Sequence, residues 1–188
     1  MYFSNKSILT DNYLKNLSEP FRFILFIFIG SILLTISAKI SIPFYPVPMT
    51  LQTLVVLFIG MTFGRVVAPA TISLYLLQGA IGLPVFALGG GLPYLFGPTG
   101  GYLIGFLAAS IILSNLATIG WNRKYSLTFI SLVLGISTIF VCGLLQLSTV
   151  LSLTFLKTIE IGFSPFMFGE FFKILILTVL IPFIINKS

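Results

Sequence analysis

The pentapeptide GEFFK, residues 169–173, places a carboxylate and an ammonium group within an otherwise apolar stretch. Glu170 and Lys173 are three residues apart, so they lie on the same face of a helix. If that helix spans a membrane, each charge at its centre costs about 2.5–3.5 kcal/mol, and both residues need a reason to be there. One acceptor beside one donor suits a small neutral group that offers both N–H and C=O. An ion pair that only locks the helix is the alternative.

A second group of residues lies in the uncharged stretch 83–106, LPVFALGGGLPYLFGPTGGYLIGF, in which glycine and proline recur. The consecutive glycines Gly89, Gly90 and Gly91 can expose backbone N–H groups as a nest for an anion such as a carboxylate. They also let the chain approach a ligand closely. A flexible loop is the alternative, just as the polar groups nearby can simply bond neighbouring helices or mark the membrane interface. Those polar groups are Thr50, Gln52, Gln78, Tyr94, Thr99 and Tyr102.

The composition indicates which solvent surrounds these groups. The chain has 188 residues, of which 57% are hydrophobic and only 7% are charged, whereas soluble domains average about 25% charged residues. A core of this size cannot hide so much apolar surface from water, so an integral membrane protein is expected. Backbone groups in lipid need internal partners, which leaves helices or a closed barrel. Long runs of Leu, Ile and Phe favour an all-α fold over the alternating strands of a barrel.

Six apolar runs predict six transmembrane helices. The polar residues 1–20 precede them as an N-terminal segment, and residues 21–188 are expected to form a single transmembrane domain. The fifth run is too long for one upright span, so we expect one long helix that is tilted or bent. Prolines in KISIPFYPVPMTLQ separate the first run from the second. The runs cover residues 23–38, 50–63, 66–81, 101–119, 126–156 and 166–185.

The cations are distributed unevenly between the two sides of this arrangement. Only Lys39 and Lys157 fall on the side away from the termini, and Lys173 lies within a span. The positive-inside rule therefore predicts that both termini are cytoplasmic. The Gly- and Pro-rich segments 39–50, 82–100 and 157–165 then all lie on the outer side, where we expect them to cover an outward-facing pocket. Ordinary surface loops are the alternative. The cations on the side of the termini are Lys6, Lys15, Arg22, Arg65, Arg123, Lys124 and Lys187.

Several chemistries are disfavoured by what the chain lacks. It has no histidine and a single cysteine, Cys142, which excludes a Ser-His-Asp triad and gives no cluster of metal ligands. No Gly-rich phosphate loop is present, so the chain is not expected to hydrolyse ATP itself. The net charge of +6 is scattered along the chain, which indicates membrane topology rather than nucleic-acid binding. An enzyme is disfavoured, and no metal or cofactor is expected.

Three blocks of the sequence resemble a known family. PVPMTLQTLVVLFIG, LLQGAIGLPVFALGGG and LFGPTGGYLIGF lie in order within about residues 40–106 and are similar to the BioY family. Its members are the biotin-specific substrate-binding components of energy-coupling-factor (ECF) transporters. The block GPTGGY, residues 97–102, after GLPVFA, residues 82–87, is the most specific part. The resemblance implies a six-helix protein that binds biotin with high affinity from outside. It also implies partners: a transmembrane coupling subunit and two cytoplasmic ATPases. The lack of a recognisable transit peptide favours a bacterial plasma membrane as the location.

The resemblance also suggests ligand contacts. The family pattern G-D-x-x-K matches Gly169, Glu170 and Lys173, with Glu in place of Asp. We hypothesise that Glu170 accepts from a ureido N–H, that Lys173 donates to the ureido oxygen, and that apolar and aromatic groups pack the ring and chain. The ligand carboxylate would meet backbone N–H groups at residues 89–91, together with Tyr102. Gln52 and Tyr94 complete the expected site.

The first helix carries the expected docking face. Substrate-binding components commonly place small residues four apart on this helix, so that it packs closely on the coupling subunit. Ser31 and Thr35 are the nearest match, an imperfect copy of that pattern.

Two other functions remain open. A stand-alone secondary transporter or channel for another small solute would function without partner ATPases, and repeat symmetry would favour it. A membrane-embedded enzyme would turn a substrate over, whereas simple retention of unmodified ligand would count against it.

Overall fold

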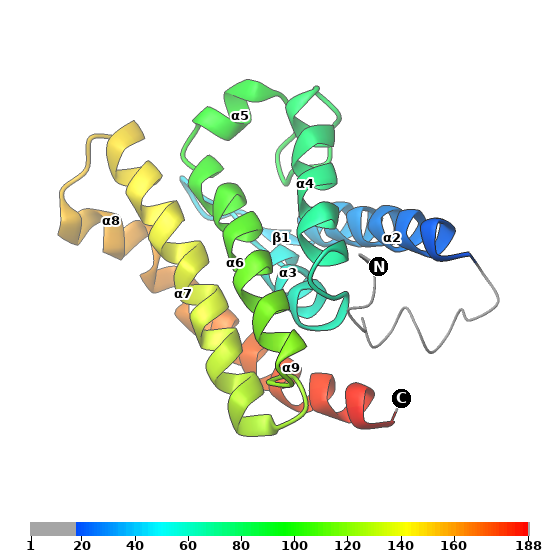
Figure 1. Cartoon of the computed structure of the whole chain (residues 1–188). Coiled ribbons are helices and arrows are strands. Elements are labelled where there is room, and N and C mark those ends of the chain that lie inside the picture. Colours follow the sequence, from blue (N-terminus) through cyan, green and yellow to red (C-terminus); the bar gives the residue numbers. More distant parts are fainter. Residues whose placement is uncertain (1–17, 188) are drawn as a thin grey trace.

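The computed structural model describes residues 18–187, and the predicted N-terminal segment, residues 1–20, lies almost entirely outside them. Most of the described chain is helical (Figure 1). In chain order the elements are α2 (Glu19–Lys39), β1 (Ser41–Ile42), β2 (Met49–Thr50), α3 (Gln52–Thr62), α4 (Val67–Ala80), α5 (Leu92–Phe96), α6 (Gly100–Thr118), α7 (Tyr125–Val150), α8 (Phe155–Gly162), η1 (Ser164–Phe166) and α9 (Met167–Lys187).

The all-α membrane fold predicted from composition is confirmed. Four helical stretches among the described residues are long and apolar enough to cross a membrane: α2, α6, α7 and the continuous stretch Phe155–Lys187, which holds α8 and α9. The helices α3 and α4 are apolar but shorter, and they correspond to the two short runs at residues 50–63 and 66–81.

The prediction of one long helix over residues 126–156 was wrong. Helix α7 ends at Val150, and α8 begins at Phe155. Ser152 adopts a left-handed backbone with φ of 50°, and the N–H of Leu153 bonds the carbonyl of Ser148 at 3.0 Å. This bond closes the helix end, as a left-handed residue beyond a helix commonly does. The segment 157–165 is accordingly mostly helical, in α8 and η1, rather than irregular.

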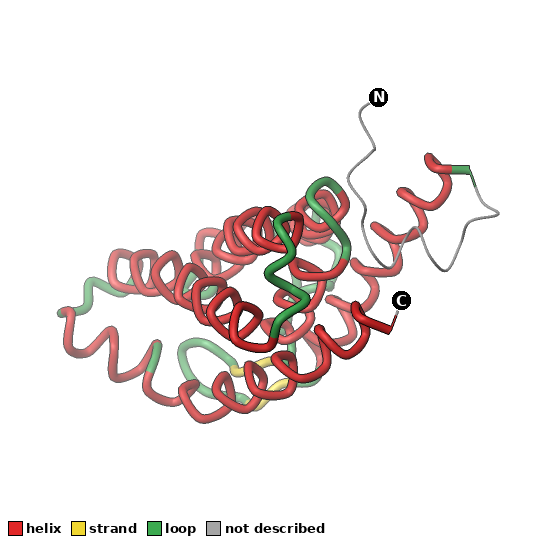
Figure 2. Tube along the Cα trace, turned by 60° about the horizontal axis from the view of Figure 1, so that its bottom comes forward, coloured by secondary structure: helices red, strands yellow, loops and turns green. Residues whose placement is uncertain are grey.

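The other two Gly- and Pro-rich segments are non-helical for much of their length. Residues 39–50 form a hairpin in which β1 and β2 pair antiparallel, with Ser41 opposite Thr50; Figure 2 shows its strands in yellow. Residues 82–91 fold into a loop, here called the α4–α5 loop, which is closed by a bridge between Phe86 and Gly89.

The glycines that follow the α4–α5 loop pack helices together. Helices α6 and α7 run side by side (Figures 1 and 2). A Cβ atom at Gly101 would lie 2.3 Å from the carbonyl oxygen of Cys142, and one at Gly105 would lie 2.8 Å from the Cα of Ile139. Any side chain at either position would therefore push α7 away. The block GGYLIGF thus specifies a close helix seam.

Hydrogen bonds from two asparagines connect the turns that contain Arg65 and Arg123 at one end of the bundle. Asn122 donates to the carbonyl of Met61 at 2.9 Å, and Asn186 donates to the carbonyl of Arg123 at 3.1 Å. The end of α3, the α6–α7 turn and the end of α9 therefore lie together. The N-terminal half of α2 projects from the rest of the bundle (Figures 1 and 2), and its buried residues begin only at Gly30.

Candidate ligand-binding site

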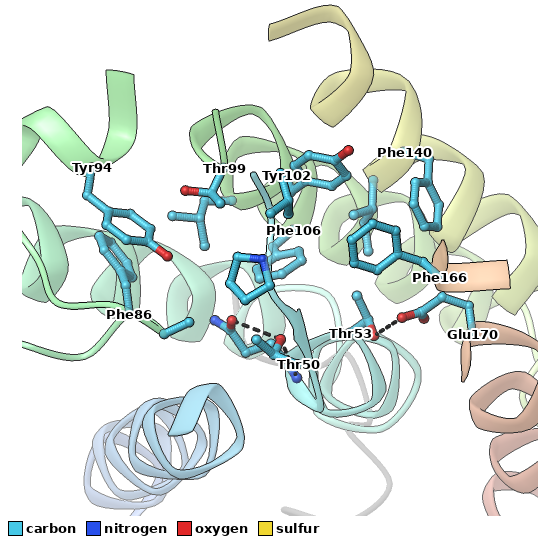
Figure 3. Close-up of a pocket in the computed structure, with 16 residues that line it drawn as sticks. Thr50, Thr53, Phe86, Tyr94, Thr99, Tyr102, Phe106, Phe140, Phe166 and Glu170 are labelled. Carbon is cyan, nitrogen blue, oxygen red and sulfur yellow. Dashed lines mark hydrogen bonds between the residues drawn. The ribbon is translucent and has the colours of Figure 1, made fainter. Parts of the chain in front are cut away.

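A pocket lies where the hairpin and the α4–α5 loop meet helices α3, α5, α6, α7 and α9 (Figure 3). The space between its walls is about 540 Å³, part of which is open to solvent. Its wall is largely apolar and aromatic. The aromatic lining residues are Phe86, Tyr94, Tyr102, Phe106, Phe140 and Phe166; the polar ones are Thr50, Gln52, Thr53, Thr99 and Glu170.

The predicted charged pair lies at this pocket. Glu170 and Lys173 are 5% and 6% exposed, and the Nζ of Lys173 lies 2.6 Å from the Oε1 of Glu170. The same ammonium group donates to the backbone carbonyl of Thr50 at 2.7 Å and to the hydroxyl of Thr53 at 2.8 Å. An ammonium group has three donors, so all the donors of Lys173 are engaged within the protein. Lys173 itself is not among the residues that line the pocket.

One oxygen of the pair is left without a partner. The Thr53 hydroxyl donates to the Oε1 of Glu170 at 2.9 Å, so this oxygen receives two bonds. The Oε2 of Glu170 is buried and has no hydrogen-bond partner among the described residues. Leaving a buried polar atom unsatisfied costs about 1–3 kcal/mol, and more when the group is charged. Glu170 lines the pocket, so this oxygen is the acceptor that the pair still has to offer to an N–H donor of a ligand.

Gln52 reaches the pocket but is held by its neighbours. Its Nε2 donates to the Tyr75 hydroxyl at 2.7 Å, and its Oε1 accepts from the Thr50 hydroxyl at 3.0 Å. Tyr75 in turn donates to the carbonyl of Val85 at 3.0 Å. The chain of bonds therefore ties the start of α3 to the α4–α5 loop. Gln52 positions both walls of the pocket.

The two predicted tyrosines contribute differently. The Tyr102 hydroxyl donates to the carbonyl of Gly162 at 2.8 Å, so this residue offers its ring to the pocket rather than its hydroxyl. The Tyr94 ring stacks on Phe86 with centroids 5.1 Å apart, and its hydroxyl points towards the pocket in Figure 3. Burial raises the pKa of the Tyr94 hydroxyl, so this group stays protonated at neutral pH.

The glycine run does not reach the pocket. None of Gly89, Gly90 and Gly91 is among its lining residues. The N–H of Gly89 bonds the carbonyl of Phe86 at 3.4 Å, and that of Gly91 bonds the carbonyl of Gly79 at 2.6 Å. Gly89 and Gly91 therefore do not form the expected anion nest, because their donors bond carbonyls of the loop and of α4 instead. Gly91 has a φ of 100°, a conformation that favours glycine.

Of the predicted docking pair, Ser31 is buried against α4, whereas Thr35 bonds its own helix. Ser31 is 1% exposed, and its hydroxyl donates to the side-chain carbonyl of Gln78 on α4. Thr35 is half-buried and donates to the backbone carbonyl of Ser31 at 2.9 Å. Both small residues thus serve the packing or local bonding of α2 within this chain. The large apolar side chains of α2 are the exposed ones, among them Ile32 and Ile36.

Several pocket residues were not predicted from the sequence. Thr53 follows Gln52 in a polar break within an apolar run, and that break could have indicated it. The aromatic residues Phe106, Phe140 and Phe166 lie on α6, α7 and η1. No sequence pattern distinguishes them from lipid-facing phenylalanines, because only the fold brings them to one wall.

Comparison with known proteins identifies the group to which this fold and site belong. The model of the BioY family matches residues 10–187. The chain belongs to the BioY family. Biotin transporter BioY of Thermotoga maritima is 35% identical over 145 residues, which are 77% of this chain and 84% of that protein. Biotin transporter BioY2 of Lactococcus lactis is 34% identical over 155 residues, 80% of this chain and 83% of that protein.

A solved structure supports the fold of this BioY member. The S-component for biotin from an ECF-type ABC transporter superposes with a TM-score of 0.80 at 21% sequence identity. The match covers 92% of this chain and 95% of that one. The six-helix arrangement is therefore that of an S-component. The relatives named above are transporters rather than enzymes.

Proposed function

We propose that this chain binds biotin and is the substrate-binding component of a biotin uptake system. Its membership of the BioY family and the names of its relatives support this proposal. The observation that carries it is the buried, unpartnered Oε2 of Glu170 at the wall of an aromatic pocket. Biotin has a ureido ring with N–H donors and a thioether ring with a short apolar chain, which suit that oxygen and that wall.

The arrangement suggests a specific division of roles. The Oε2 of Glu170 accepts a hydrogen bond from a ureido N–H, and the rings of Tyr102, Phe140 and Phe166 pack the bicyclic ring system and chain. Lys173 does not bond the ureido oxygen while its three donors are engaged. Its role is to neutralise Glu170 and hold it in place, which revises the donor role expected from the sequence.

The pocket is proposed to open to the outer side of a bacterial plasma membrane, with both termini cytoplasmic. The basic turns at Arg65 and Arg123 support this orientation, because basic residues concentrate on the cytoplasmic side. Energy is proposed to come from a transmembrane coupling subunit and two cytoplasmic ATPases, since the chain has no phosphate-binding loop of its own.

Calorimetric titration of the purified chain with biotin tests the binding proposal, with thiamine and riboflavin as control ligands. We expect biotin alone to bind. Glu170→Gln replaces half of the acceptor set with an amide, and we expect it to weaken biotin binding by about tenfold or more. Wild-type protein that binds no biotin, or a Glu170→Gln variant with unchanged affinity, would overturn the proposal.

A further inference from the structure

The proposed ligand has an anionic end for which the pocket lining offers no cation. Among the described residues the lining includes one carboxylate, Glu170, and no lysine or arginine. The N–H groups of Gly89 and Gly91, which were expected to meet the ligand carboxylate, bond carbonyls of the chain itself. A carboxylate in such a site needs a charged partner nearby, because charge-assisted hydrogen bonds are about twice as strong as neutral ones.

Lys39 is not itself a lining residue, but its ammonium group bonds the backbone of one that is. It is the last residue of α2, and its Nζ donates to the carbonyl of Phe86 at 2.6 Å. Phe86 and its neighbour Ala87 both line the pocket. The next residue, Ile40, accepts a backbone bond from Leu51 at the base of the hairpin, at 3.1 Å. Lys39 therefore links the base of the hairpin to the α4–α5 loop, two segments that supply pocket-lining residues.

Lys39 is also the lysine at this end of the bundle whose charge is left without an acidic partner in the described part of the chain. Lys157 is bonded to Glu160 at 3.0 and 3.1 Å, and Lys173 is buried against Glu170. Lys39 is exposed, and one of its three donors is engaged, by the carbonyl of Phe86. A neutral carbonyl leaves its charge uncompensated.

We propose that Lys39 binds the carboxylate of the ligand at the mouth of the pocket. The inference rests on the proposed function and assigns the end of biotin that Glu170 does not contact. Glu170 would recognise the ureido ring at the buried wall, and Lys39 would recognise the charged tail at the exposed edge. A lysine that serves only to latch the α4–α5 loop, or to mark the membrane interface, would not distinguish a charged tail from a neutral one.

Titration of the purified full-length chain with biotin and with biotin methyl ester separates these roles. The ester keeps both rings and the chain but has no negative charge. We expect wild-type protein to prefer biotin over the ester. Lys39→Met should weaken biotin binding by about fivefold to tenfold and leave ester binding unchanged, and Lys39→Arg should retain the preference for biotin. Unchanged ester affinity also shows that the variant is folded.

Lys157→Met is the matched control, since it removes another exposed lysine at the same end and should change neither affinity. An equal loss of both ligands in Lys39→Met would overturn the proposal in favour of a latch, and unchanged affinity for both would overturn it outright. Wild-type protein that binds neither ligand would instead overturn the proposed function, and the role of Lys39 with it. Glu170→Gln should weaken both ligands alike, because it acts on the ring they share.

Discussion

At the scale of single residues, the buried ion pair determines what the pocket can recognise. Lys173 bonds Thr50, Thr53 and Glu170 at once, so its charge is neutralised and its geometry is held from two helices. Glu170 lines the pocket and keeps one oxygen without a partner among the described residues. Burying either charge without the other would cost free energy, because a desolvated charge needs an opposite charge close by. The pair acts as a single acceptor whose position the lysine sets.

This reading predicts how the lysine responds to mutation. Lys173→Met leaves Glu170 buried without its cation, and removing one partner of such a pair costs about 3–5 kcal/mol. We expect a clear loss of thermal stability in detergent, measured by unfolding of the purified variant. The double variant Glu170→Gln/Lys173→Met should recover most of that stability without recovering biotin affinity. A single Lys173→Met variant with wild-type stability and affinity would contradict the positioning role.

At the scale of elements, glycine has separate tasks in the two halves of the stretch 83–106. In the α4–α5 loop it permits a left-handed turn at Gly91 and self-bonding of the backbone. In α6 it removes side chains so that α7 can approach at Gly101 and Gly105. Gln146 on α7 reinforces the seam by donating to the carbonyls of Leu95 and Gly97, both at 2.8 Å. Helix α5 is thereby held over the pocket.

The helix seam can be tested with a pair of glycine variants. Gly105→Val places branched methyl groups against the α7 backbone, where a Cβ atom alone already lies too close. Overpacking of this kind costs about 1–3 kcal/mol, and we expect lower thermal stability together with weaker biotin binding. Gly97→Ala is the control, because its Cβ atom would make only ordinary 3.4 Å contacts. Equal stability of the two variants would argue against a packing role.

At the scale of the whole molecule, basic turns lie at one end of the helix bundle and the pocket lies towards the other. The turns that carry Arg65 and Arg123 lie together with the C-terminal end of α9. The hairpin and the α4–α5 loop, which contribute to the pocket, follow the C-terminal ends of α2 and α4. A bundle of this kind presents its regular, basic end to one compartment and its pocket to the other. In the proposed complex, the cytoplasmic ATPases would act on the chain from this basic end.

Cysteine labelling in intact cells tests the orientation. In a Cys142→Ser background, Tyr45→Cys at the exposed hairpin tip should react with a membrane-impermeant maleimide. Ser126→Cys, exposed at the start of α7, should react only after permeabilisation. The reverse pattern would place the pocket in the cytoplasm and would be incompatible with uptake from outside. Labelling of both sites in intact cells would instead indicate a mixed topology.

The sequence by itself determined that the protein lies in a membrane, that its fold is helical, and that Glu170 and Lys173 form a pair. Composition alone required a membrane protein, and apolar runs located the helices, since both depend on transfer of side chains from water. Glu170 and Lys173 were brought together by the helical repeat. The blocks at residues 46–60, 76–91 and 95–106 were enough to indicate the family. These features are local in the chain, so no contact between distant segments was needed to predict them.

Only the tertiary structure decided which donors and acceptors are free. Thr53 meets Glu170 across 117 positions, and Lys39 meets Phe86 across 47. Such bonds engaged the donors of Lys173 and left one oxygen of Glu170 open. Bonds within and around the α4–α5 loop engaged the N–H groups of Gly89 and Gly91, and the fold turned Ser31 towards α4. Whether a polar group can bind a ligand depends on which partners already satisfy it, and those partners are set by folding rather than by spacing.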